Sequence, residues 1–148
     1  MRAIVSVLIF AAAVACTQKP DTPPAADSAA PGEISTPPSG ITDREWLLVQ
    51  LGDKLSPQGN GGKPVTLTLA SAEGRASGDA GCNQYSGPFT LSGNQLTFGP
   101  AISTKMACEQ GMDVETAFLS MLNDVRTYQA TDSSLTLRGA SGPVARFR

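Results

Sequence analysis

Apolar and polar residues alternate in several short segments of this chain, and the alternation predicts a domain built mainly from β-strands. The clearest examples are Trp46–Leu51 and Val65–Leu69; in the second, Thr66 and Thr68 separate apolar residues that would face a core. Residues Ser56–Gly62 lie between these segments and are rich in turn formers, so we expect a loop there.

Two further antiparallel pairs of strands are expected along the chain. Ser92, Gly93 and Asn94 separate two apolar runs, which is typical of a hairpin with a positive φ angle at Gly93 or Asn94. A second turn, at residues 139–143, joins the last two strands. The four predicted strands are Phe89–Leu91, Gln95–Phe98, Leu135–Leu137 and Val144–Phe147.

One amphipathic helix is predicted between these pairs, because six apolar residues recur at helical spacing. Asp113 is in position to cap it, and Glu115 lies in the first turn, where the helix dipole favours negative charge. Glu115, Ser120 and Asn123 are expected on its solvated face. The apolar stripe consists of Val114, Ala117, Phe118, Met121, Leu122 and Val125.

In this order the elements predict an α+β fold, with a small antiparallel β-sheet or partly closed barrel packed with one amphipathic helix. The domain is expected at residues 43–148, which is long enough for one hydrophobic core. Histidine is absent, which excludes Ser-His-Asp and Cys-His catalytic units and histidine-ligated metals. With 11 basic and 13 acidic residues and no basic patch, we expect no nucleic-acid partner. We also expect no enzyme activity, no cofactor and no metal.

The first residues predict export. Arg2 precedes an apolar run from Ile4 to Ala15, which is shorter than the ~20 residues of a membrane-spanning helix and typical of a cleaved leader. Ala13-Val14-Ala15-Cys16 resembles a bacterial lipobox, so residues 1–16 are interpreted as a lipoprotein signal peptide with Cys16 lipidated. Ordinary cleavage after Ala13 or Ala15 is the alternative.

Residues 17–42 are rich in proline and alanine, a composition that buries too little apolar surface to fold. We expect a disordered tether that holds the domain away from the membrane. Thr17 after the cysteine, in place of aspartate, favours outer-membrane sorting. The expected location is therefore the cell envelope, with a lipid on Cys16 as the membrane partner and the domain facing the periplasm.

Cys82 and Cys108 remain as an even pair in an oxidising compartment, which favours a disulfide. Such a bridge would restrict the unfolded chain by about 3.5 kcal/mol. Buried free thiols and a redox-active pair are the alternatives: Cys108 lies just before the predicted helix, although no C-x-x-C spacing is present. Metal binding by two thiolates without histidine is less favoured than either.

The residues around these cysteines form a candidate recognition surface, since binding residues often lie on loops of a rigid scaffold. Gly78, Gly81 and Gly87 resemble an anion nest, but the lysine of a phosphate loop is missing, and close backbone approach explains them more simply. Asn83 is also expected to hydrogen-bond local backbone. The candidate residues are Asn83, Tyr85, Ser86, Thr104 and Lys105.

These segments resemble the signature of the META domain, also called the HslJ-like family. The resemblance rests on Trp46-Leu47-Leu48 with a following Gly52, on the block from Gly81-Cys82-Asn83 to Gly87, and on Thr104 through Cys108. Gly52 lies one residue closer to the tryptophan motif than is usual, and Lys105 stands where arginine is frequent. The resemblance implies an envelope or secreted domain with antiparallel strands and a helix, linked in some members to heat shock, novobiocin resistance or virulence, and no catalytic residues.

Three functional hypotheses follow. The first is a non-catalytic, lipid-anchored envelope module that supports stress tolerance by binding a protein or a small apolar ligand. The second is a small-molecule or drug-binding carrier with a cavity between helix and sheet, beside Phe118 and Met121. The third is a thiol-redox protein, which requires accessible thiols of low pKa at Cys82 or Cys108.

Overall fold

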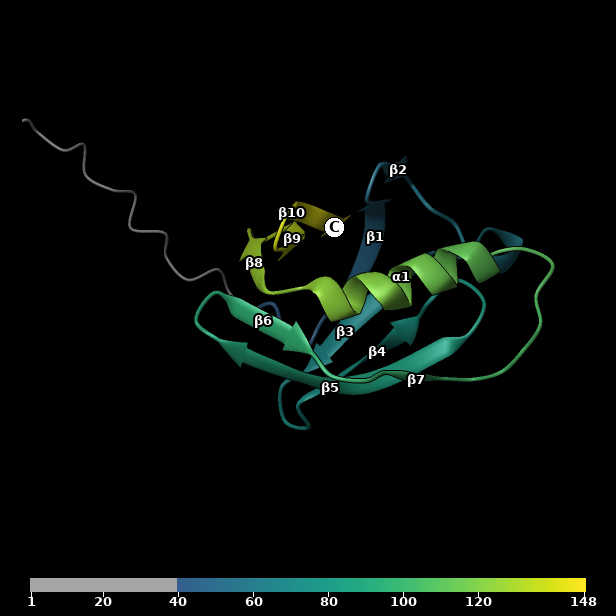
Figure 1. The fold of residues 1–148 in the computed structure, drawn as a ribbon. Coiled ribbons are helices and arrows are strands. Elements are labelled where there is room, and N and C mark those ends of the chain that lie inside the picture. Colours follow the sequence, from purple (N-terminus) through teal and green to yellow (C-terminus); the bar gives the residue numbers. More distant parts are fainter. Residues whose placement is uncertain (1–39) are drawn as a thin grey trace, which may run out of the picture. The chain divides into compact units, whose positions relative to one another are not determined.

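The computed structural model describes residues 40–148, and its elements are named as in Figure 1. One α-helix, α1 (Met112–Asp124), lies between two groups of strands, and a short 3-10 turn occupies Asn60–Gly62. The strands are β1 (Glu45–Leu51), β2 (Lys54–Leu55), β3 (Thr66–Ala70), β4 (Arg75–Asp79), β5 (Gln84–Ser92), β6 (Gln95–Phe98), β7 (Ile102–Ser103), β8 (Thr127–Ala130), β9 (Leu135–Gly139) and β10 (Gly142–Phe147).

Eight of these strands form a closed antiparallel barrel in the order β1, β3, β4, β5, β6, β8, β9 and β10. The barrel closes because β10 pairs with β1, where Leu48 lies opposite Phe147. Between β6 and β8 the contact is short, with one pair of facing residues, Gln95 and Thr127. The two-residue strands β2 and β7 add to β1 and β5 and stand outside the closed path.

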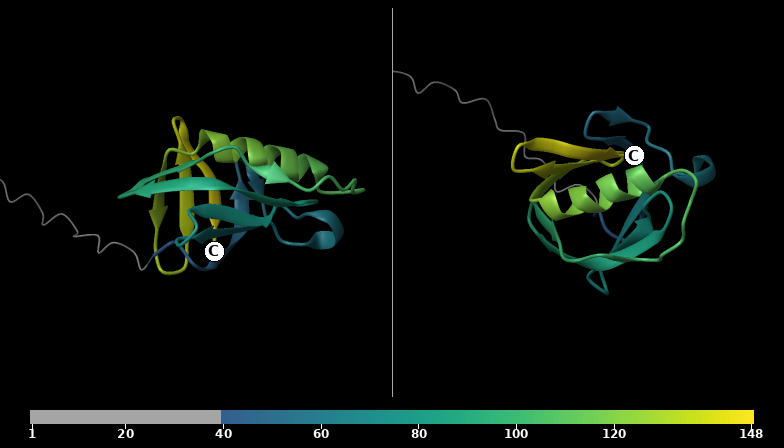
Figure 2. Two further views of the ribbon diagram at one scale, coloured as in Figure 1. Left: turned by 90° about the horizontal axis from the view of Figure 1, so that it is seen from below. Right: turned by 45° about the vertical axis from the view of Figure 1, so that its right-hand side comes forward.

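The apolar face of α1 packs against the inner faces of the strands, which curve around the helix in the right-hand view of Figure 2. Phe118 is fully buried, and its ring centroid lies 5.3 Å from that of Tyr85 on β5 and 6.4 Å from that of Phe147 on β10. Leu67, Leu137 and other residues predicted to face inward also have no exposed surface. Side chains therefore fill the space between Phe118 and the two strands.

The structure confirms the α+β class, but the small sheet expected from the sequence is a closed barrel. The predicted hairpin is β5 and β6, and Gly93 in its turn has a φ of 58°. Both closing strands and the two N-terminal strands are present at their predicted places. The sequence prediction missed β2, β4, β7 and β8, which are short or contain few alternating apolar residues.

The predicted helix is present, with three corrections. Its N-cap is Gly111, in the left-handed region at a φ of 86°, and Asp113 lies within the first turn, so the capping prediction is wrong. Glu115 is buried, where solvent exposure had been expected, and Ala117 of the apolar stripe is exposed. The buried face of α1 is therefore rotated from the predicted one, toward Glu115 and away from Ala117.

The ordered domain begins before residue 43. Ile41 was assigned to the tether, but it is buried in the core, and its carbonyl oxygen accepts a hydrogen bond of 2.9 Å from Trp46 Nε1. The predicted signal peptide, the lipidated Cys16 and the tether up to residue 39 lie outside the described residues. From residue 40 onward, no helix combines the length and apolar character needed to cross a membrane.

Candidate functional site

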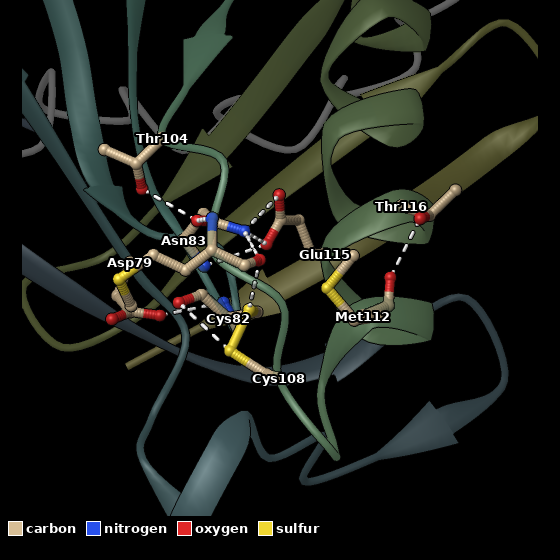
Figure 3. Close-up of a disulfide and its surroundings, with 10 residues drawn as sticks. Asp79, Cys82, Asn83, Thr104, Cys108, Met112, Glu115 and Thr116 are labelled. Atoms are coloured by element: carbon tan, nitrogen blue, oxygen red, sulfur yellow. Dashed lines mark hydrogen bonds between the residues drawn. A yellow bond between two sulfur atoms is a disulfide. The ribbon is translucent and has the colours of Figure 1, made fainter.

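A disulfide joins Cys82 and Cys108, as the sequence predicted (Figure 3). It links the residues just before β5 to the segment that leads into α1, residues 104–111, which we call the strap. The two Cα atoms lie 5.9 Å apart. Cys82 is buried and Cys108 is half-buried, so the bridge lies at the margin of the core.

Asn83 is the centre of a buried polar network beside the disulfide, and it is only 2% exposed. Its Oδ1 accepts hydrogen bonds from Thr104 Oγ1 at 2.8 Å and from the backbone N–H of Met106 at 2.7 Å. Its Nδ2 donates to the carbonyl oxygen of Met106 at 3.2 Å and to Glu115 Oε2 at 3.0 Å. One side chain thus connects β5, the strap and α1, as Figure 3 shows.

Glu115 completes this network from the first turn of α1. Its Oε2 also accepts a hydrogen bond of 2.8 Å from the backbone N–H of Asn83. The carboxylate is 7% exposed, and its position in the first turn places it where the partial positive charge of a helix N-terminus favours an anion. Among residues 40–148, no group of three or more His, Cys, Asp or Glu side chains is arranged to hold a metal ion.

The glycines near the disulfide allow backbone segments to touch. The N–H of Asn60 donates to the carbonyl oxygen of Gly81 at 2.6 Å. A Cβ atom placed on Gly111 would lie 2.6 Å from that same oxygen and 2.8 Å from the nitrogen of Asn60, closer than van der Waals contact permits. These contacts account for Gly111. A Cβ on Gly81, whose φ is 123°, would lie 3.0 Å from the carbonyl oxygen of Gly111, so close backbone approach also accounts for Gly81, as the simpler of the two sequence interpretations proposed.

Two of the five predicted recognition residues are buried, and the surface prediction is wrong for them. Asn83 lies in the network described above. Tyr85 is 3% exposed, packs on Phe118, and donates its hydroxyl hydrogen to the carbonyl oxygen of Thr66 at 3.1 Å. Burial raises the pKa of Tyr85 far above its usual range, so the phenol is neutral at every physiological pH.

The other three predicted residues reach the surface. Ser86 and the exposed Thr104 line a groove of about 400 Å³ between β4, β5 and β7, which we call the signature groove; the little of Tyr85 that is exposed also lines it. Ser86 is half-buried, and its Oγ accepts a hydrogen bond of 2.8 Å from Arg75 Nη2. Lys105 is exposed on the strap and follows Thr104, which lines the groove.

Ile102 and Glu115 belong to this region but were not predicted as site residues. Ile102 lines the signature groove, and 72% of its surface is exposed. Its sequence gave little indication, because β7 has two residues and no alternating pattern. The burial of Glu115 could have been predicted, since it falls beside Phe118 and Leu122 on the helical surface.

Comparisons with known proteins agree with this architecture. The META domain family matches residues 39–148. The chain is similar to a protein from Burkholderia xenovorans with an NMR structure, at 31% identity and a TM-score of 0.59, covering 72% of this chain and 81% of that one. A second NMR structure, at 23% identity and a TM-score of 0.54, covers 70% of this chain and 86% of its own and supports the fold. No curated protein matches the chain.

Proposed function

Because the chain belongs to the META domain family, we propose that it is a non-catalytic, lipid-anchored binding module of the cell envelope with a stress-related role. The observation that carries this proposal is the Cys82–Cys108 disulfide. Structural disulfides persist in oxidising compartments such as the bacterial periplasm and are rare in the cytosol. This agrees with the export expected from the N-terminal sequence, which would place the protein at the outer membrane, facing the periplasm, through a lipid on Cys16.

A binding role without catalysis fits the chemistry of the signature region. Its most polar buried groups, Asn83 and Glu115, are hydrogen-bonded to each other and to the strap. Groups used in this way hold the scaffold. Nearby, the apolar Ile102 is exposed and is surrounded by hydroxyls and Lys105, which matches the apolar centre and polar rim of a protein–protein contact.

The anchor and the bridge are tested together by intact-mass analysis of protein purified from the envelope, with and without reductant. We expect a diacyl or triacyl adduct on Cys16, no reactive thiol before reduction, and reactive Cys82 and Cys108 afterwards. A Cys16→Ser variant should lose the adduct and leave the membrane fraction. A soluble wild-type protein with reactive Cys82 or Cys108 would refute the anchored module and favour a thiol-redox protein.

The binding surface is tested with Ile102→Asp in the full-length chain, compared with Leu91→Asp, which adds the same charge at the other end of β5. Leu91 is 37% exposed, and neither change empties the core. If the signature groove contacts a partner, only Ile102→Asp should reduce survival of heat or antibiotic stress in cells that depend on the gene. Equal survival of both variants would exclude the signature groove as the partner surface.

A small-molecule carrier is the second candidate, and the structure changes where its ligand would bind. The expected cavity beside Phe118 is filled by the rings of Tyr85 and Phe147. Met121, on the same helix, lines a groove on the outside of the barrel. Small-molecule binding is therefore favoured at that outer groove over the space between helix and strands.

A further inference from the structure

A second groove lies between α1, the β1–β2 turn and β10, and Figure 1 labels these elements. Its volume is about 540 Å³, within the range of small-molecule sites. We call it the helix-side groove. Leu51 and Met121 are buried beneath it, and Val144 is a half-buried part of its wall.

The helix-side groove exposes apolar surface that the fold leaves uncovered. Ala117 continues the apolar stripe of α1, but it is exposed and lines the groove, because the barrel covers the helix from the opposite edge of the stripe. Pro143 on β10 is likewise exposed there. A ligand with an apolar body would therefore remove Ala117, Pro143 and Val144 from water.

Two carboxylates border this apolar surface. Asp53 and Asp124 both line the groove, and no ion pair within 4.0 Å reaches either of them among residues 40–148. Val144 lies near the backbone beside Asp53 and near that of Asp124. The N–H of Gly52 donates to the Val144 carbonyl oxygen at 3.0 Å, and a Cβ on Gly139 would meet both the Asp124 carbonyl oxygen and Val144 Cγ1 at 3.1 Å.

The nearest cation is held at the rim by another residue. Lys54 lines the groove, but its Nζ lies 3.2 Å from Asp113 Oδ2, and Asp113 does not line the groove. The ammonium of Lys54 thus pairs with Asp113 and not with Asp53 or Asp124. The groove keeps a negative charge next to an apolar floor. This combination is complementary to a ligand with a positive charge and an apolar body.

We propose that the helix-side groove binds small amphipathic amines, with the apolar body of the ligand on Ala117, Met121 and Val144 and its ammonium between Asp53 and Asp124. This site is separate from the signature groove and does not depend on the proposed membrane anchor. The ligand is a small molecule, because the volume of the groove matches a drug-sized compound.

The test uses three probes with the same apolar body: phenylbutylamine, phenylbutanol and phenylbutyrate. Each is titrated into the full-length chain with Cys16→Ser, which removes the predicted lipid alone, while amide NMR shifts are followed. The amine should shift Gly52, Ser120 and Val144 and bind at least about fivefold more tightly than the alcohol, with the carboxylate weakest. The shifts should not include the strap.

Charge variants separate a specific site from general attraction. Asp53→Asn with Asp124→Asn should weaken amine binding by about 5- to 30-fold, whereas Glu73→Gln with Glu109→Gln, which changes the net charge equally at exposed positions elsewhere, should leave it unchanged. Lys54→Met removes the competing ammonium and should tighten amine binding by about 2- to 3-fold.

Several outcomes would overturn the proposal. These are equal binding of amine and alcohol, shifts outside the helix-side groove, an equal loss in the two double variants, or no shift at millimolar amine. Concentration-dependent shifts without any probe would show that a second copy of the chain occupies the groove, which also contradicts it. Failure of the membrane anchor in the mass experiment would leave this result unaffected.

Discussion

The signature region and the helix-side groove use polar side chains in opposite ways. In the signature region, Asn83 and Glu115 are buried and satisfy each other, and a disulfide closes the same junction. At the helix-side groove, Asp53 and Asp124 lack an ion-pair partner among the described residues, and the rim is held by one pair, Lys54 and Asp113, that is 61% and 71% exposed. The first region is built for rigidity and the second is left open.

This difference separates the residues that identify the family from the residues that would bind a ligand. The residues that make the sequence recognisable, such as Cys82 and Asn83, hold the junction together: replacing Cys82 breaks the disulfide, and replacing Asn83 leaves buried polar groups unsatisfied. The exposed groove residues, such as Asp53 and Asp124, contribute little to the fold. A ligand site of this protein is therefore expected among the less distinctive residues.

The largest change in stability should come from Asn83→Leu, in the signature region. This change removes the Nδ2 donor to the buried Glu115 carboxylate, which keeps the backbone N–H of residue 83, and it takes the Asn83 side chain away from both backbone groups of Met106; we expect the free energy of unfolding to fall by about 3–5 kcal/mol. Urea unfolding with the disulfide intact provides the measurement. The matched control is Asn123→Leu on the exposed face of α1, which should change stability by no more than about 0.5 kcal/mol.

Equal losses in these two variants would show that the polar network is not what holds the strap. Glu115→Leu combined with Asn83→Leu sharpens the point. Replacing both partners removes the unsatisfied charge, so the double variant should be more stable than Asn83→Leu alone. A double variant less stable by the sum of the two single losses would contradict a direct interaction between the side chains.

The second effect in size should come from removing the disulfide with Cys82→Ala and Cys108→Ala. The bridge spans 26 residues, so its loss should lower the free energy of unfolding by about 2–4 kcal/mol, mainly by freeing the unfolded chain. Urea unfolding measures this loss, and wild-type protein with reductant is the control. The strap should remain in place through Asn83, so its amide NMR signals should persist in the folded variant; their disappearance would show that the disulfide alone holds the strap.

The helix shows how far the sequence could predict this structure. Its apolar stripe located α1 correctly, because a periodic pattern defines a helix over many residues. The stripe did not define where the buried face ends. At about 100° per residue, Glu115 lies about 20° from Leu122 on the helix surface, whereas Ala117 lies about 40° beyond Met121 at the opposite edge. Hydrophobicity favoured Ala117 for burial, and a hydrogen-bond partner, Asn83, decided the outcome for Glu115.

Barrel closure and the two grooves could not be predicted in the same way. Closure depends on the pairing of β10 with β1, two segments at opposite ends of the domain whose facing residues are two apolar pairs and one polar pair, Gln50 with Arg146. Nothing in either pattern specifies its partner. The disulfide was predictable because an even pair of cysteines in a chain expected to be exported has few alternatives, whereas Asp53 and Asp124 line one groove only through tertiary structure.

The smallest effect should come from Lys54→Met at the rim of the helix-side groove. The hydrogen bond from Lys54, followed by one from the backbone N–H of Val114, holds the pKa of Asp113 below its usual value of 3.8. A carboxyl with a lowered folded-state pKa contributes stability above pH ~3.8 and loses it as the pH falls through the folded value. In Lys54→Met the pKa of Asp113 should rise toward 3.8 without reaching it, because the Val114 N–H remains.

Carbon NMR titration of the side-chain carboxyls measures this change, with Asp43 as the internal control. The pKa of Asp43 is lowered by hydrogen bonds from Ser71, and Lys54 takes no part in this. The pKa of Asp43 should therefore not change in Lys54→Met. Because both partners of the rim pair are largely exposed, urea unfolding at neutral pH should be indistinguishable from wild type. A loss as large as that of the disulfide variant would make the rim a structural element like the signature region and remove the contrast on which the amine site depends.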